Sequence, residues 1–237
     1  MTQSQEEAQQ CGLIPEDNDP AFVAQHLSAY AFARPQIAGQ RVLEIGFGDG
    51  YGAAYLAESA REVVAADVTA GNIPRAQVKY PRPNLSFQYF DGLRLPFPEG
   101  SFDAVCTFQV IEHVPEHQLV SWVGEIRRVL RVGGRLHVST LNLEQSRKPG
   151  QPYQKLIYHE KEFTGPELLA LLEQVFDKGR VTLYGLHYTP LHRFFRRLKK
   201  WGFRNAAYFR QITLQDFQVT RTNLRRSLDL IAVCEKS

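Results

Sequence analysis

The chain has few cysteines and no long hydrophobic run. Its three cysteines, Cys11, Cys106 and Cys234, are too few and too far apart for a disulfide framework or a cysteine-based metal site. No apolar stretch approaches the roughly 20 residues that a membrane-spanning helix needs. The first residues also lack the charged-then-apolar pattern of a secretion signal. These absences argue against a secreted scaffold and an integral membrane protein, and we expect a protein of the reducing cytoplasm.

The composition is that of an ordinary globular protein. The chain has 237 residues, of which 43% are hydrophobic and 22% are charged. It is therefore long enough for one α/β domain with additions and a sizeable core. Residues 1–19 are polar and rich in Gln, Glu and Asp. We expect them to be a mobile lead-in to a single domain over residues 20–237.

Strand-like and helix-like segments alternate along the chain. The strand-like runs are Arg41–Ile45, Glu62–Ala66, Leu85–Phe90, Phe102–Phe108, Arg135–Thr140, Arg180–Leu186 and Leu228–Val233. The helix-like stretches are Pro20–Ala33, Tyr51–Ala60, Gly71–Tyr80, Gln118–Arg131 and Thr164–Phe176. This alternation predicts an α/β fold with a doubly wound, seven-stranded and mostly parallel sheet, and with a helical insertion before the last strand.

The most informative segment is RVLEIGFGDGYG, from Arg41 to Gly52. A short apolar run is followed by four glycines at alternate positions, which is typical of a buried strand that runs into a glycine-rich turn. Glycine leaves room for a ligand and tolerates positive φ, so the segment predicts a site for a flat polar ligand. The dinucleotide fingerprint G-x-G-x-x-G/A fits only weakly, from Gly48 to Ala53. A dinucleotide-binding oxidoreductase therefore stays as an alternative.

Two acidic positions follow at the ends of the next two strands. Asp67 ends the second strand, where an acid can accept hydrogen bonds from the two ribose hydroxyls of a nucleoside. The third strand ends in DGLRLPFPEGSFD, from Asp91 to Asp103. After the fourth strand come FQVIEHV, over residues 108–114, and EIRRVLRVGG, over residues 125–134.

Taken with E-x-G-x-G-x-G from Glu44, these motifs resemble those of the class I S-adenosylmethionine-dependent methyltransferases, in the small-molecule, type 11-like branch. The resemblance covers residues 41–140, with the motifs in order. Two positions depart from the family pattern: Val132 stands where proline is usual, and Gln109 stands where many relatives carry an acid.

The resemblance implies a Rossmann-like fold and S-adenosylmethionine as the cofactor. It places the methionine end at residues 46–50, the ribose at Asp67 and the adenine at Asp91. The residues implied to bind the cofactor are Glu44, Gly46, Phe47, Gly48, Gly50, Asp67, Val68, Asp91, Gly92, Leu93 and Gln109. No metal ligands are assigned.

The resemblance also implies transfer of a methyl group to a small molecule or to a sugar or glycan precursor, and we expect the methyl group to be transferred to oxygen. HEKEF, from His159 to Phe163, resembles a segment of family members that act on such acceptors. An acceptor hydroxyl must lose its proton, and His113 is the candidate general base because it follows the fourth strand. His26, Tyr30 and His159 are candidate acceptor-pocket residues, with the 142–160 loop and the 188–226 insertion around them.

Three alternatives remain at this point. His113 could brace a loop or cap the next helix instead of acting as a base. A nucleic-acid methyltransferase would usually carry an N/D/S-P-P-aromatic motif after the fourth strand, and residues 106–109 read CTFQ instead. We therefore expect no specific nucleic acid as partner. A non-catalytic scaffold with a methyltransferase-like fold is the third alternative.

One segment is strongly basic. Residues 190–226 hold ten basic residues and one acid, Asp216, whereas the rest of the chain holds 18 basic and 24 acidic residues. Apolar residues recur at helical spacing over 191–201, which predicts an amphipathic basic helix. That helix could pack on the domain, cover an acidic substrate, form a dimer contact or lie on an anionic membrane surface. We expect a monomer or a homodimer.

Overall fold

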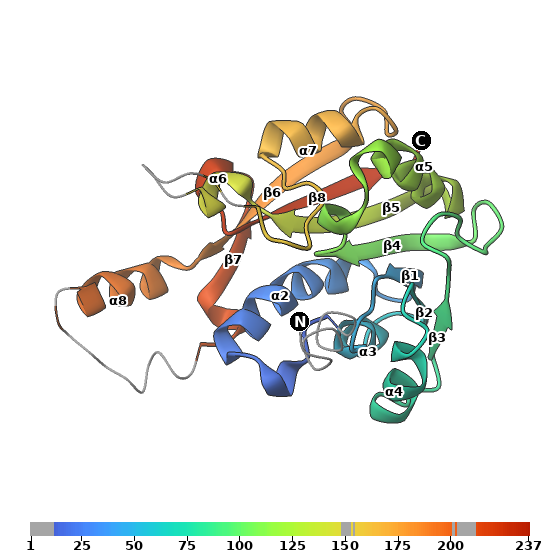
Figure 1. The fold of residues 1–237 in the computed structure, drawn as a ribbon, viewed down its shortest axis with the longest axis horizontal. Helices are drawn as coiled ribbons and strands as arrows, with labels where there is room; N and C mark the ends of the chain where they lie inside the picture. Colours follow the sequence, from blue (N-terminus) through green and yellow to red (C-terminus); the bar gives the residue numbers. More distant parts are fainter. Residues whose placement is uncertain (1–11, 148–152, 154, 201, 203–211) are drawn as a thin grey trace.

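The computed structural model describes residues 12–147, 153, 155–200, 202 and 212–237. These residues form one eight-stranded sheet in the order β3-β2-β1-β4-β5-β8-β6-β7 (Figure 1). The first five strands pair in parallel, whereas β8 is antiparallel to β5 and β6, and β7 is antiparallel to β6. The strands are β1 (Arg41–Ile45), β2 (Glu62–Asp67), β3 (Leu85–Tyr89), β4 (Phe102–Phe108), β5 (Leu130–Leu141), β6 (Val181–Tyr188), β7 (Phe217–Thr220) and β8 (Asp229–Glu235).

The mostly parallel α/β fold is confirmed, and the predicted number of seven strands is wrong by one. All seven predicted strands are present, with ends that differ by a few residues. The additional strand is β7, which lies inside the insertion predicted to be helical and pairs with residues 185–188 of β6. Its four residues, Phe-Gln-Val-Thr, are too short a run for periodicity to indicate a strand.

Helices cover both faces of the sheet (Figure 1). They are α2 (Pro20–Ala33), α3 (Tyr51–Ala57), α4 (Asn72–Lys79), α5 (Leu119–Val129), α6 (Leu143–Ser146), α7 (Gly165–Leu172) and α8 (Pro190–Lys200). Successive strand residues face opposite sides of a sheet. Leu43 therefore packs in the cluster that includes α5 and α7, and Val42 packs in the cluster that includes α2 and α3. This burial on both faces explains why the strands are almost continuously apolar.

Local signals set the starts of two helices. The Asp19 carboxylate accepts a hydrogen bond from Ala21 N at 2.8 Å, and α2 begins at the proline between them. At α7, Thr164 and Glu167 form the reciprocal capping box that the sequence predicts. Each cap satisfies backbone N–H groups that have no partner within the helix.

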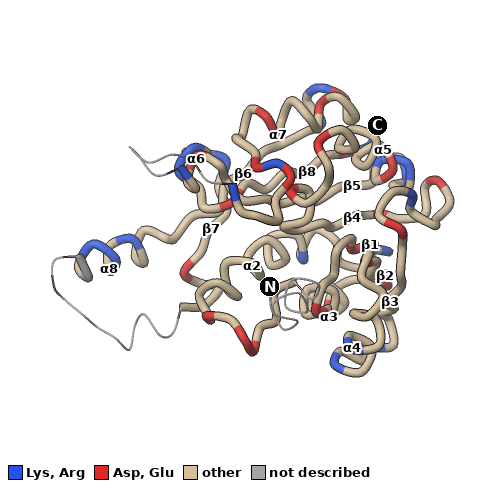
Figure 2. Tube along the Cα trace, in the orientation of Figure 1, with Lys and Arg blue, Asp and Glu red and all other residues tan. Residues whose placement is uncertain are grey.

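The helix α8 projects from the end of β6, away from the sheet (Figure 1). Several of its residues are basic (Figure 2), and Arg193, Arg196 and Arg197 are exposed. Leu191 and Phe194 are also exposed, by 62% and 54%. The amphipathic basic helix is thus present, although residue 201 lies outside the described residues. Among the residues described, no helix combines the length and apolarity required to cross a membrane.

Asp229 is expected to make the stability of the fold depend on pH. It is buried at the start of β8 with a hydrogen bond from Gln25 Nε2 at 3.0 Å, and burial raises its pKa to about 7. Because this folded-state pKa lies above the unfolded value near 3.8, the folded state holds the proton more tightly. The stability present below about pH 4 is therefore lost as the pH rises toward about 7.

We expect Asp229→Asn to remove this loss. Near pH 4 its free energy of unfolding should match that of the wild type. Near pH 8 it should be higher by at least about 1.4 kcal/mol, which corresponds to one pKa unit. Urea unfolding at both pH values measures the difference. An equal decline with pH in both proteins would show that Asp229 is not the group responsible.

Candidate cofactor and acceptor site

The order of the strands determines where a ligand can bind. The chain passes outward from β1 to β2 and β3, then returns to place β4 on the other side of β1. Ligands of open α/β sheets bind at the carboxyl ends of the strands beside such a reversal. The turn after β1, Asp67 at the end of β2 and the segment after β4 all lie at this edge.

The turn after β1 requires glycine. Gly46 has φ +80°, and a Cβ built there would lie 2.4 Å from Val110 Cγ2. Gly50 has φ +97°, and a Cβ there would lie 3.0–3.2 Å from Ala76, Phe87 and Tyr80. Gly46 N donates to Ala66 O at 2.8 Å and thus ties the turn to β2. The turn therefore presents bare backbone at the sheet edge, as a cradle for a ligand requires.

Asp67 supports this turn through several hydrogen bonds. Its Oδ2 accepts from Gly48 N at 2.9 Å and its Oδ1 accepts from Thr69 N at 2.8 Å. Burial raises the pKa of Asp67, and the two backbone hydrogen bonds oppose that shift. The side chains of Thr69 and Asn72 also hydrogen-bond to this carboxyl group, so they would have to give way for ribose hydroxyls to bind there. Asp67 therefore holds the turn in place, and we expect it to accept hydrogen bonds from the ribose once these side chains move.

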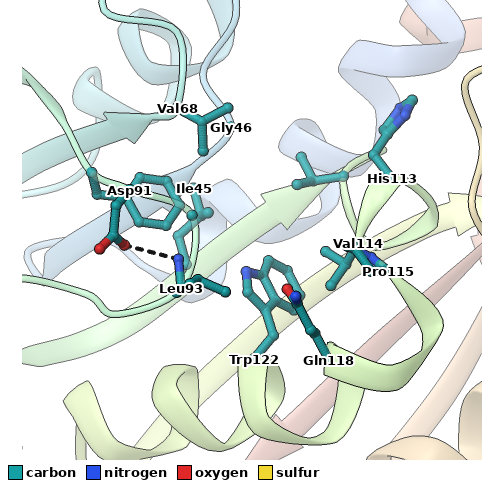
Figure 3. Close-up of a pocket in the computed structure, with 13 residues that line it drawn as sticks. Ile45, Gly46, Val68, Asp91, Leu93, His113, Val114, Pro115, Gln118 and Trp122 are labelled. Carbon is teal, nitrogen blue, oxygen red and sulfur yellow. Dashed lines mark hydrogen bonds between the residues drawn. The ribbon is translucent and has the colours of Figure 1, made fainter.

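A mostly apolar cavity of about 240 Å³ lies beside the turn. In Figure 3, Asp91 and Leu93 lie on one side, His113, Val114 and Pro115 on the other, and Trp122 and Gln118 come from the region of α5. The cavity is smaller than the roughly 300–1,000 Å³ of most ligand pockets. It therefore fits one part of a cofactor, such as a flat base, with the rest lying along the turn.

Asp91 lies at the rim of this cavity. It is exposed, and its Oδ1 accepts from Leu93 N at 2.9 Å and from Arg94 N at 3.0 Å, which lowers its pKa. The side chain is thus ionised at neutral pH and has a second oxygen available to an amino group. Gly92, with φ +87°, turns the chain immediately after it.

Glu44 and Tyr30 lie together in the core. The Tyr30 hydroxyl donates to Glu44 Oε1 at 2.7 Å, and Glu44 Oε2 has no hydrogen-bond partner among the described residues. Burial raises the pKa of Glu44 to about 8. A Cβ on Gly52 would lie 2.2 Å from the Tyr30 ring. Tyr30 thus packs against the start of α3 and does not line the cavity, and neither does His26, whose ring packs against Phe22 at 4.5 Å.

The segment after β4 carries His113. Gln109 turns the chain there with φ +56°, and its N–H donates to Ser139 O at 3.0 Å. His113 then ends a short 3-10 helix, residues 111–113. Its Nδ1 lies 2.9 Å from Tyr158 O, and desolvation lowers the pKa of the ring. The imidazole is therefore neutral at pH 7, with Nδ1–H donated to the carbonyl and Nε2 available.

His159 lies next to His113, although the two are far apart in sequence. The ring centroids are 5.0 Å apart. His159 is buried, and its Nδ1 lies 2.7 Å from Glu162 Oε1. Among the candidate acceptor residues, His159 thus contacts His113, which lines the cavity, while none of His159, Tyr30 and His26 is itself a lining residue.

Comparison with known proteins shows which family has this site. Residues 43–138 match the family model described as methyltransferase domain. The chain is 32% identical to a probable S-adenosylmethionine-dependent methyltransferase of Mycobacterium tuberculosis, over 93% of this chain and 86% of that protein. The chain belongs to the S-adenosylmethionine-dependent methyltransferases. S-adenosylmethionine is accordingly its cofactor, which removes the dinucleotide-binding alternative.

Two further comparisons agree with this. A probable methyltransferase of Mycolicibacterium smegmatis is 36% identical over 68% of this chain, and the match spans 61% of that relative's length. The solved DhpI–SAH complex has a TM-score of 0.63 at 17% identity, covering 99% of this chain and 95% of that chain. At that identity the solved structure shows the shared methyltransferase fold alone.

The cavity of this methyltransferase contains six residues that the sequence predicts for the site: Gly46, Val68, Asp91, Gly92, Leu93 and His113. The other lining residues were not predicted for the site: Ile45, Phe90, Val110, Val114, Pro115, Gln118 and Trp122. Trp122 follows the helical spacing of Leu119, Val123 and Ile126, so the pattern marks it as a core residue. Only the position of α5 in the structure shows that the Trp122 ring also borders the ligand cavity.

Proposed function

We propose that this methyltransferase methylates an oxygen of a small hydroxylated acceptor, of the sugar or glycan-precursor class. The supporting observation is the pair formed by His113, which lines the cavity, and His159, whose ring lies against that of His113. Each ring has Nδ1 engaged by a carbonyl or a carboxylate, so each can offer Nε2 to an incoming group. Two imidazoles so placed suit a neutral polar acceptor with an exchangeable proton.

In the proposed reaction the chain mainly aligns the reactants. The bound cofactor supplies an electrophilic methyl group on a sulfonium, which is transferred by direct displacement. The glycine turn, Asp67 and Asp91 would hold the cofactor, and the acceptor would enter from the side of His113. The hydroxyl proton passes to Nε2 of His113, while the Tyr158 carbonyl keeps Nδ1 protonated.

Methyl transfer from isotope-labelled S-adenosylmethionine tests this proposal. The acceptors should include free sugars, nucleotide-linked sugars and lipid-linked sugars, with amines and transfer RNA as the competing classes. We expect label in a hydroxylated acceptor, and NMR of the product should show an O-methyl group. Label found only in amines or RNA would overturn the proposal.

We further propose that α8 contacts an anionic membrane surface, where lipid-linked acceptors would be found. Its exposed apolar residues, Leu191 and Phe194, could enter the headgroup region, while Arg193 and Arg197 face anionic lipid. None of the described residues that line the cavity belongs to α8. That favours a surface role for this helix over that of a substrate cover.

Vesicle flotation tests the role of α8. Each basic residue near an anionic surface contributes about 1 kcal/mol, so Arg193→Glu/Arg197→Glu should lower the partition coefficient by about 30-fold or more. The control is Arg61→Glu/Arg82→Glu, which changes the net charge equally on the body of the domain. Equal losses in both variants, or no association of the wild type, would exclude a specific role for α8.

A further inference from the structure

Three side chains that can bind a metal converge at His113, which lines the cofactor cavity. Glu112 and His113 come from the segment after β4, and His159 comes from the loop before α7. One ligand atom from each residue lies within 4.8 Å of the other two. The sequence suggests no such cluster, because its spacing matches no metal motif.

Backbone hydrogen bonds hold the two segments together. Glu160 N and Lys161 N both donate to Glu112 O, at 2.7 Å and 3.1 Å. His159 N also donates to Leu156 O at 3.0 Å, which turns the loop back on itself. The two histidines are therefore brought together by main-chain contacts and do not depend on an ion for their proximity.

The second nitrogen of each ring is held as it is in metal sites. His113 Nδ1 lies 2.9 Å from Tyr158 O, and His159 Nδ1 lies 2.7 Å from Glu162 Oε1. Histidines that ligate metals usually donate their other N–H to a carbonyl or carboxylate, which fixes the tautomer and the ring orientation. Nε2 is thus the free nitrogen of both rings. Tyr153 further fixes Glu162 through a hydrogen bond from its hydroxyl.

Glu112 supplies an independent observation. Its side chain is 1% exposed, and Oε2 makes no hydrogen bond of normal geometry to any described residue. A buried acceptor without a partner is costly, because it has given up its hydrogen bonds to water. A cation bound between Glu112 and the two imidazoles would satisfy this oxygen.

We propose that Glu112, His113 and His159 form a binding site for a divalent transition-metal ion of the zinc type. Two imidazoles and one carboxylate, with one open position, are a typical three-ligand set for Zn²⁺, whereas Mg²⁺ and Ca²⁺ prefer oxygen ligands. Bonds of about 2.1 Å in a tetrahedral site place ligand atoms about 3.4 Å apart. The exposed side chain of His113 would therefore move toward the two buried ligands on binding.

The ion has a functional consequence that rests on the proposed role of His113 as base. Nε2 of His113 cannot hold a metal ion and accept a proton at the same time. Zn²⁺ is therefore expected to inhibit methyl transfer, and a chelator should reverse the inhibition.

Calorimetric titration of the metal-free, full-length protein with Zn²⁺ tests the site directly. We expect one equivalent to bind, and Co²⁺ in its place should give the visible absorption of a four-coordinate ion. His159→Gln and Glu112→Gln should each weaken binding by at least about tenfold. Both residues are buried, so His113→Gln at an exposed position serves as the variant least expected to disturb folding. His117→Gln, another exposed histidine nearby, is the control and should bind Zn²⁺ as the wild type does.

The outcomes separate the site from the reaction. No stoichiometric Zn²⁺ binding, or unchanged binding in His113→Gln and His159→Gln, would overturn the metal site and leave the proposed methyl transfer intact. Zn²⁺ binding that depends on these residues but leaves the rate unchanged would support the site and overturn the base role of His113.

Discussion

Replacing His113 by glutamine is expected to lower kcat by about 10²–10⁴-fold, the usual contribution of a positioned general base. Glutamine is close in size and can still hydrogen-bond, but it cannot take the proton of an acceptor hydroxyl. The affinity for S-adenosylmethionine should stay within about twofold, because His113 lies across the cavity from Asp91 (Figure 3). Steady-state kinetics with the methylated acceptor and calorimetry with the cofactor measure the two quantities separately.

His117→Gln is the matched control for this experiment. It makes the same substitution on an exposed residue close in the sequence, and none of the cavity-lining residues is His117. Its kcat should equal that of the wild type. If His113→Gln kept kcat within about threefold, His113 would be a residue that braces the loop through Tyr158, and another group would have to accept the proton.

Asp67→Ala is expected to weaken binding of S-adenosylmethionine by at least about 100-fold. Two hydrogen bonds from ribose hydroxyls to a carboxylate contribute about 1.5–3 kcal/mol each, and about 1.4 kcal/mol corresponds to a factor of ten in Kd. The substitution also removes the acceptor of Gly48 N, so the glycine turn loses a contact that holds its shape. Calorimetry with the cofactor and with its demethylated product measures the loss.

Asp103→Ala provides the control, because Asp103 is an acid at the opposite end of the sheet. It accepts from Arg41 N at 2.7 Å and pairs with Arg131 at 2.5 Å. Its loss should lower stability by about 1–2 kcal/mol and leave the Kd for the cofactor unchanged. A similar loss of affinity in both variants would mean that the effect of Asp67→Ala comes from general destabilisation and that the ribose is bound by other groups.

The part of the fold that binds the methyl donor could be predicted from the sequence, because its structure depends on neighbouring residues. In residues 41–67, strand, turn and helix follow one another directly, and Gly46 and Gly50 have conformations that their neighbours in sequence and packing demand. Each short motif therefore predicts its own geometry. The register of the parallel strands then places the ends of β1 and β2 side by side, with Ile45 opposite Ala66.

Tyr30 shows why the residues around the acceptor were harder to predict. Its position in the N-terminal helix suggests a residue that lines the pocket. In the structure its hydroxyl reaches Glu44 in the core, and its ring fills the space left by Gly52. Helical periodicity can predict which face of the helix such a residue lies on, but it cannot predict which residues that face packs against. β7 was missed for a related reason, since a four-residue strand is stabilised by its partner β6 and not by its own pattern.

The sequence by itself indicated the cofactor, because its glycine turn and the acids at two strand ends match the motifs of a family that binds S-adenosylmethionine. Only the tertiary structure brought together the residues on which the proposed acceptor side rests. Glu112, His113 and His159 meet only because Glu160 N and Lys161 N bond to Glu112 O, and Trp122 borders the cavity only because α5 follows β4. Such long-range contacts depend on how separate elements pack, and no sequence spacing records that packing.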